Sequence, residues 1–351
     1  MIRQVTSGPY INHPTYFLQS SFFPGDAEMF FTSYRTGEAQ LFEISLAGGD
    51  ARQLTHGAPI HPYSPALHPD GRTLVVTRGS GLWAIDRDTL QERRIFAFDS
   101  AQLGECSISP DGEWLTAAFA GQGCGAPKRG LVVCRFGGNS STVIPFPRTV
   151  IHPQFHPLEP DWIEFSGDPA PRMHRVRRDG SGLECLYQHG NDEFIVHETF
   201  LGATGNLAFT VWPHALRVMD WTTRAIRTIA DYNAWHIAPD RAGRRILCDT
   251  NHPDEGLQII DAASGARTPL CLSGSSNQGS QWRKSSYALA EDFAQARNTL
   301  SWMENAVDTV YGPQHTHPHP SWSRGEAMVA FASDASGVTQ VYVTQVPVAA
   351  V

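Results

Sequence analysis

The sequence is poor in cysteine and has no paired cysteine motif. Its 351 residues include six cysteines, which stand at separate positions with no Cys-x-x-Cys. Such spacing is untypical of a disulfide framework or of a zinc–thiolate site. We therefore expect reduced, partly buried thiols.

Long apolar runs and basic patches are also absent. No stretch approaches the roughly 18 apolar residues of a membrane-spanning helix, and residues 1–9 lack the apolar core of a signal peptide. Lys and Arg number 27 against 35 Asp and Glu, a formal charge of −8 without runs of like charge. This balance argues against a nucleic-acid surface or a membrane-binding patch. We expect a cytoplasmic protein with neither kind of partner.

What the sequence does contain is a repeat of about 40 residues. Its clearest copy begins at Tyr63 and places Pro69-Asp70-Gly71 before the apolar segment 73–77. Pro presets φ, Asp caps the bend and Gly takes a positive φ, so this tripeptide marks a turn between strands. Seven copies are found, and they begin near Ser20, Tyr63, Cys106, Gln154, His197, His236 and His319.

The repeat predicts the fold class. Short β-branched and aromatic segments such as 29–32, 41–44 and 341–343 are typical of half-buried antiparallel strands. Seven four-stranded units of this length predict an all-β fold, a seven-bladed β-propeller that forms a single domain over residues 1–351. The N-terminal residues 3–6 would supply the missing strand of the last blade.

One segment interrupts the repeat before its last copy. It is rich in Ala, Glu and Gln, and its apolar residues recur at helical spacing from Leu289 to Leu300. This pattern predicts a helical insertion over residues 283–305. Insertions on one face of a repeat protein often border its binding site; the alternative is a decoration without function.

The sequence has 15 histidines, and the densest group lies near its C-terminal end. His317 and His319 are two residues apart, so in an extended segment both imidazoles point to the same side. Pro318 and Pro320 bias the histidines before them toward extended conformations. Two neutral imidazoles suit a divalent metal, and Gln314 could add a carbonyl oxygen. Polar loop histidines or hydrogen-bonded core histidines are the alternative.

Two further repeat units begin with histidine, at His197 and His236. Equivalent positions of propeller blades line the central axis, so residues about 40 apart in sequence converge in space. These two histidines, the segment 314–319 and Arg172 could therefore share one funnel. For any one such histidine taken alone, a hydrogen bond between blades is the alternative.

Two weaker candidates stand near other blade entries. Gln154 could hydrogen-bond to a polar ligand, with hydrogen bonding between blades as the alternative. Tyr16 stands near the entry of the first blade and could line the funnel. We expect both to contribute to substrate binding.

At these residues the sequence resembles the oligogalacturonate lyases, seven-bladed propellers of polysaccharide lyase family 22. The resemblance runs over nearly the whole chain and is carried by Arg172-Met173, Val196-His197-Glu198, Trp235-His236 and Gln314-x-x-His317-Pro318-His319-Pro320. The last of these segments is the most specific.

The resemblance implies a metal-dependent lyase. The residues that it implies as ligands of a divalent metal, usually manganese, are His236, Gln314, His317 and His319. It implies that His197 is the base and that Arg172 binds the substrate carboxylate. The expected reaction is β-elimination in an acidic, oligogalacturonate-type oligosaccharide: the base removes the C5 proton while the metal and the guanidinium neutralise the carboxylate.

The sequence departs from the family pattern in three places. His315 stands inside the ligand motif where a small or apolar residue is expected, residues 165–168 lack a histidine expected just before Arg172, and the insertion is longer than expected. These differences bear on the substrate more than on the reaction, so other uronate oligosaccharides stay open. A metal-dependent hydrolase and a non-catalytic propeller scaffold are the rival functions. The oligomeric state is left open.

Overall fold

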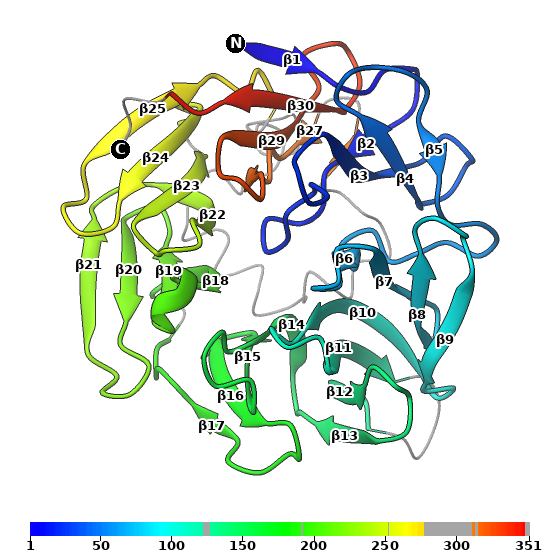
Figure 1. Ribbon diagram of the computed structural model, residues 1–351. Helices are drawn as coiled ribbons and strands as arrows, with labels where there is room; N and C mark the ends of the chain where they lie inside the picture. Colours follow the sequence, from blue (N-terminus) through cyan, green and yellow to red (C-terminus); the bar gives the residue numbers. More distant parts are fainter. Residues whose placement is uncertain (122–126, 191, 252, 277–310, 313–314, 348–351) are drawn as a thin grey trace. The chain divides into compact units, whose positions relative to one another are not determined.

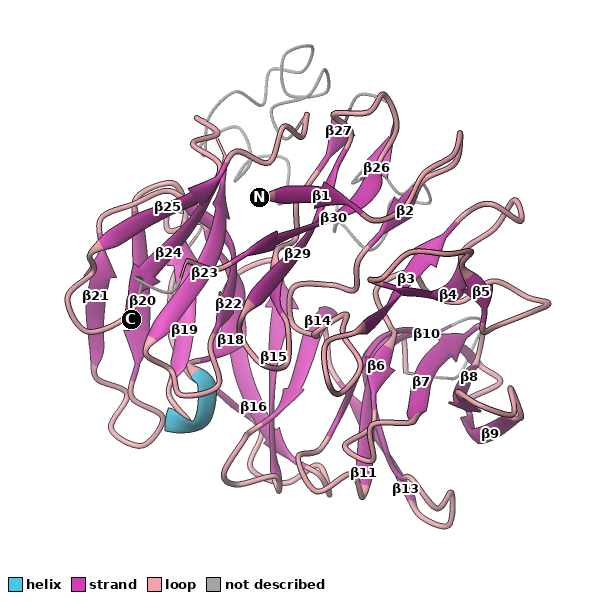
Figure 2. Ribbon diagram, turned by 45° about the horizontal axis from the view of Figure 1, so that its top comes forward, coloured by secondary structure: helices cyan, strands magenta, loops and turns pink. Residues whose placement is uncertain are grey.

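The computed structural model describes residues 1–121, 127–190, 192–251, 253–276, 311–312 and 315–347. Almost all regular structure among them is β-strand. The only helical segment in these residues is the single 3-10 turn η1 (Gly202–Thr204), drawn in cyan in Figure 2. The part of the chain that the structure describes holds no helix with the length and apolar character needed to span a lipid bilayer.

The described strands form seven four-stranded sheets and one two-stranded sheet. The predicted all-β class with seven four-stranded blades is therefore confirmed. The predicted helical insertion, residues 283–305, lies outside the described residues. The cysteines among the described residues are free.

The chain divides into two compact units, the first made of residues 1–37, 43–51 and 191–351 and the second of residues 38–42 and 52–190. Strand β4 (Gln40–Ser45) lies partly in each. The order of its sheet is β2 (Asn12–His13), β3 (Glu28–Ser33), β4 and β5 (Arg52–Gln53).

The first unit holds three complete sheets whose strands pair in antiparallel fashion (Figure 1). One has the order β18 (Ile195–Phe200), β19 (Leu207–Val211), β20 (Ala215–Met219) and β21 (Ile226–Ala230). The next has the order β22 (Ala234–Pro239), β23 (Arg245–Thr250), β24 (Leu257–Asp261) and β25 (Arg267–Cys271). In the third, β1 (Ile2–Gln4) pairs with β30 (Gln340–Gln345), followed by β29 (Met328–Ser333) and β28 (Ser321–Trp322). The two-stranded sheet pairs β26 (Tyr311–Gly312) with β27 (His315–Thr316).

The second unit also holds three antiparallel sheets. The first has the order β6 (Ala66–Leu67), β7 (Thr73–Arg78), β8 (Gly81–Asp86) and β9 (Glu92–Ala97). The second has the order β10 (Ala101–Ile108), β11 (Trp114–Gly121), β12 (Arg129–Arg135) and β13 (Ser141–Pro145). The third has the order β14 (Thr149–Phe155), β15 (Trp162–Asp168), β16 (Met173–Arg177) and β17 (Glu184–Cys185).

The Pro-Asp-Gly tripeptides form turns between strands, as predicted. Between β6 and β7, Asp70 Oδ1 accepts the backbone N–H groups of Arg72 and Thr73, each at 2.8 Å. Gly71 takes a φ of 72°, which a residue without a side chain adopts at little cost. The turn therefore sets the register of the strands on either side.

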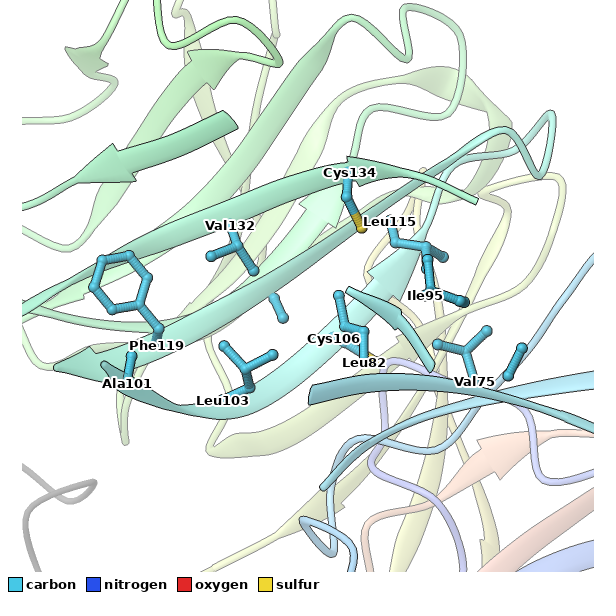
Figure 3. Packing of buried hydrophobic residues seen from close by; sticks show 12 residues of the cluster. Val75, Leu82, Ile95, Ala101, Leu103, Cys106, Leu115, Phe119, Val132 and Cys134 are labelled. Carbon is cyan, nitrogen blue, oxygen red and sulfur yellow. The ribbon is translucent and has the colours of Figure 1, made fainter. Parts of the chain in front are cut away.

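Apolar side chains of neighbouring sheets pack against one another within each unit. Figure 3 shows such a cluster in the second unit, where Val75 and Leu82 of one sheet meet Leu103, Leu115 and Val132 of the next. A similar cluster in the first unit joins the sheet of β23 to the sheet of β29. Full burial of each such side chain contributes about 1.5–3 kcal/mol. The sheets are thereby held as rigid supports for the residues on their first strands.

Four sheets carry a β-bulge in their first strand. The register shifts fall between Leu103 and Cys106, Ile151 and Gln154, Val196 and Thr199, and Ala234 and Ile237. A bulge bends its strand and changes the direction of the side chain that it contains. Two of these bulges, both in the first unit, contain His197 and His236.

Candidate metal centre

Three buried histidines of the first unit meet. His236 comes from β22, and His317 and His319 come from the segment just before β28. One ring nitrogen of each lies within 4.8 Å of those of the other two. The ring centroids of His236 and His319 are 4.0 Å apart, and those of His317 and His319 are 5.8 Å apart. We call these three residues the histidine triad.

The triad contains three of the four residues predicted from sequence as metal ligands. The fourth, Gln314, lies outside the described residues. His315 belongs to β27, where it pairs with Gly312.

The predicted extended backbone at His319 is wrong. His319 has a φ of 43°, in the left-handed region that residues other than glycine rarely adopt. The Pro318 carbonyl accepts the N–H of Ala332 in β29 at 2.8 Å, and the His319 side chain is buried. These tertiary interactions outweigh the local preference imposed by Pro320. The two imidazoles converge through a turned backbone rather than through the alternation of a strand.

The surroundings of His319 keep its imidazole neutral. Burial lowers the pKa of His319 well below its usual range, and the nearby imidazoles of His236 and His317 lower it further. A neutral imidazole has a lone pair at physiological pH, and this is the form that binds a divalent cation.

His236 is held by a carboxylate from the neighbouring strand. Asp249 in β23 accepts the backbone N–H of His236 at Oδ1 and lies against His236 Nδ1 with Oδ2, both at 2.7 Å. Burial raises the pKa of the Asp249 carboxyl well above its usual range, while the hydrogen bond from the His236 backbone opposes that rise. Sequence reasoning missed Asp249, because no motif marks it.

His197, the predicted base, lies beside the triad. Its ring centroid is 4.3 Å from that of His236. Its ring meets Trp235 edge-on at 4.7 Å and Phe17 edge-on at 5.3 Å. His197 has a φ of 54° within the bulge of β18, so the bulge sets the direction of this side chain. Phe17, which is 3% exposed, was not predicted.

Tyr16 and His13 also lie near His319 of the triad. The Tyr16 ring meets His319 edge-on at 5.0 Å between centroids, so this predicted substrate-binding residue lies against the triad. His13 is fully buried, and burial lowers its pKa to about 4. Its imidazole also contributes to the lowered pKa of His319. The structure therefore gathers five histidines in this part of the first unit.

Arg172 lies in the second unit, just before β16. Its side chain is 2% exposed, and its Nη1 is 3.4 Å from Asp168 Oδ1. The Arg172 backbone N–H donates to His189 Nε2 at 2.9 Å, and Arg148 Nη1 donates to the Pro171 carbonyl at 2.8 Å. The segment that carries Arg172 is therefore fixed by side chains on both sides. Sequence reasoning did not single out Asp168, Arg148 or His189 as its supports.

Gln154 also lies in the second unit, directly opposite Glu164 in the pairing of β14 with β15. Its Nε2 donates to Glu164 Oε2 at 3.2 Å and to the His152 carbonyl at 3.4 Å. The amide nitrogen is therefore engaged within its own sheet.

Two curated proteins are similar to the chain in sequence, although no protein-family model matches it. An oligogalacturonide lyase of Pectobacterium atrosepticum and an oligogalacturonate lyase of Dickeya dadantii are each 21% identical to it, over 98% of this chain and 92% of the relative.

Solved structures extend the likeness to the fold. A structure described as an oligogalacturonate lyase in complex with manganese matches with a TM-score of 0.80 at 18% identity, over 99% of this chain and 93% of that one. The oligogalacturonate lyase of Vibrio parahaemolyticus matches with a TM-score of 0.77 at 18% identity, over 99% of this chain and 94% of that one. The chain is thus similar in sequence and in fold to the oligogalacturonate lyases over almost its whole length.

Proposed function

We propose that this chain is a manganese-dependent lyase that cleaves oligogalacturonate-type oligosaccharides by β-elimination. The observation that carries the proposal is the histidine triad with His197 beside it. The likeness to curated oligogalacturonate lyases over 98% of the chain supports the reaction and the substrate class. The solved relative described as a manganese complex supports the choice of cation.

The donor set of the triad fits such a cation. Three imidazole nitrogens suit a first-row divalent ion, and oxygen ligands from Gln314 and from a substrate carboxylate would favour Mn²⁺ within that series. The neutral state of His319 agrees with this use. When bound, the cation would act as a Lewis acid that stabilises the negative charge developing on the uronate carboxylate.

His197 is the proposed base. The C5 proton of a galacturonate residue lies α to the carboxylate, and a neutral imidazole has a suitable basicity near pH 7. His197 takes this proton, the electrons of the C5–H bond form the C4=C5 double bond, and the bond from C4 to the glycosidic oxygen breaks. The leaving oxygen takes up a proton, and no water is consumed.

Arg172 is proposed to bind the substrate carboxylate, because the sequence pattern around it resembles that of the oligogalacturonate lyases. A guanidinium offers paired N–H donors that match the two oxygens of a carboxylate. The ion pair with Asp168 supports this role, because it fixes the orientation of a guanidinium that is almost fully buried. Tyr16 and Gln154 are proposed to contact the sugar.

The test is an ultraviolet absorbance assay on a panel of uronate oligosaccharides, with Mn²⁺ and with EDTA. Elimination creates a conjugated C4=C5 double bond that absorbs in the ultraviolet, and we expect this signal with oligogalacturonates and its loss with EDTA. A hydrolase would release reducing sugar without the absorbance, and a scaffold would do neither. Activity that survives EDTA would overturn the metal dependence, and a stronger signal with another uronate would change the substrate.

A further inference from the structure

Asp249 is a buried carboxylate to which the proposed reaction gives no role. It lies in β23, and its side chain is 1% exposed. Its Oδ1 accepts the backbone N–H of His236, and its Oδ2 contacts the ring nitrogen Nδ1 of the same residue, both at 2.7 Å. One carboxylate therefore holds both the main chain and the ring of a single histidine.

The same carboxylate reaches a second member of the triad. The backbone of His319 lies close enough to lower the pKa of the Asp249 carboxyl. His236 belongs to β22 and His319 lies just before β28, yet their ring centroids are 4.0 Å apart. Asp249 thus lies near two histidines that are far apart in the sequence.

In the part of the chain that the structure describes, no arginine or lysine forms an ion pair with Asp249, and its ionisable partner is His236. A buried carboxylate is costly unless a positive charge compensates it. A divalent cation bound to the triad would supply that charge through the imidazole of His236.

The contact also determines which nitrogen of His236 can bind a metal. With a cation on the triad to compensate its charge, Asp249 is ionised and only accepts hydrogen bonds, so Nδ1 carries the proton and Nε2 keeps its lone pair. Histidine ligands of metals are commonly fixed in this way by a carboxylate behind the ring.

We propose that Asp249 is a positioning residue of the metal centre. It holds His236 in the tautomer protonated at Nδ1, so that Nε2 is the metal ligand. This inference rests on the metal dependence of the proposed function.

The test measures Mn²⁺ affinity by titration calorimetry on chelator-treated protein, without any activity assay. In Asp249→Asn, the amide oxygen can still accept the His236 backbone N–H, but the NH₂ group then faces Nδ1 and favours the proton on Nε2. We expect this variant to bind Mn²⁺ about 10- to 100-fold more weakly than the wild type, with its thermal unfolding transition retained.

Asp240→Asn is the matched control. Asp240 lies in the turn between β22 and β23. Its side chain is also 1% exposed, and it pairs with Arg245 at 2.9 Å rather than with a histidine. We expect Asp240→Asn to lower stability and to leave Mn²⁺ affinity unchanged. Nitrogen NMR of labelled histidine in the wild type loaded with diamagnetic Zn²⁺ in place of Mn²⁺ should show His236 protonated at Nδ1.

The outcomes separate this inference from the proposed function. Equal Mn²⁺ affinity in wild type and Asp249→Asn, or an equal loss in Asp240→Asn, would overturn the role of Asp249 and leave the lyase proposal standing. Coordination of Zn²⁺ through Nδ1 of His236 in the wild type would overturn it even if Asp249→Asn did not fold. A wild type that binds no Mn²⁺ would overturn both.

Discussion

The imidazole of His197 lies 4.3 Å from that of His236, measured between ring centroids. The proposed base and a proposed metal ligand are therefore neighbours, although they come from different sheets. A base acts on the substrate, whereas a ligand binds the cation. Substitution of His197 should therefore lower turnover alone, and substitution of His236 should also lower cation binding.

Replacement of His197 by Ala should lower turnover by about 10² to 10⁴-fold, the usual contribution of a general base. The Mn²⁺ affinity of His197→Ala should stay close to that of the wild type. His236→Ala should lose both activity and Mn²⁺ binding. The ultraviolet assay and titration calorimetry measure the two effects, and a loss of Mn²⁺ binding in His197→Ala would make His197 a ligand instead of the base.

Replacement of Arg172 by Met should lower turnover by about 10² to 10³-fold. It should also lower the free energy of unfolding by about 3 kcal/mol or more, because Asp168 loses a guanidinium in a place where both side chains are almost fully buried. Urea unfolding and the ultraviolet assay measure these effects.

The double variant Arg172→Met/Asp168→Asn separates stability from substrate binding. Without the charge at Asp168, most of the lost stability should return, whereas turnover should stay low. Recovery of turnover together with stability would show that Arg172 is only structural.

Mn²⁺ should stabilise the folded protein. A ligand at 100 times its Kd adds about 2.7 kcal/mol to the free energy of unfolding, so scanning calorimetry should show a higher melting temperature with Mn²⁺ and a return to the starting value with EDTA. His317→Ala should abolish the increase. An unchanged increase in that variant would place the bound cation elsewhere.

Stability should fall in mild acid because of His13. Burial lowers its pKa from 6.5 to about 4, so the unfolded chain binds the proton more tightly than the folded one. The contribution of His13 to stability is therefore complete above pH 6.5 and is lost as the pH falls toward about 4. Over this window the wild type should lose on the order of 3 kcal/mol more than His13→Asn.

The Asn side chain at position 13 keeps a donor for the Pro14 carbonyl, which His13 Nδ1 contacts at 2.9 Å. Urea unfolding of both metal-free proteins at a series of pH values measures the difference. Parallel pH profiles for the two proteins would contradict the assignment.

The features that could be predicted from sequence are those that repeat. Turns such as the one at Asp70 have a local chemical cause, and their recurrence gives the number of sheets. The approach of His236 to His317 could be predicted as well, because equivalent positions of successive repeat units fall at equivalent places in the fold.

The remaining features depend on contacts that leave no local signal. The positive φ of His197 arises in a bulge, and that of His319 runs against the preference imposed by the following proline. Asp249 faces His236 through the pairing of β22 with β23, which a shift of register would undo. Phe17 lies between two short strands, and its packing against His197 follows from the tertiary structure alone.

The pairing of β1 with β30 has a consequence for how the molecule is made. Ile2 pairs with Thr344 and Gln4 with Tyr342, so during translation one strand of this sheet leaves the ribosome before every other described strand and its partner after all of them. The sheet is therefore completed only after every other described strand has been synthesised. His319, which directly precedes that sheet, therefore gains its full surroundings only once β30 has been synthesised.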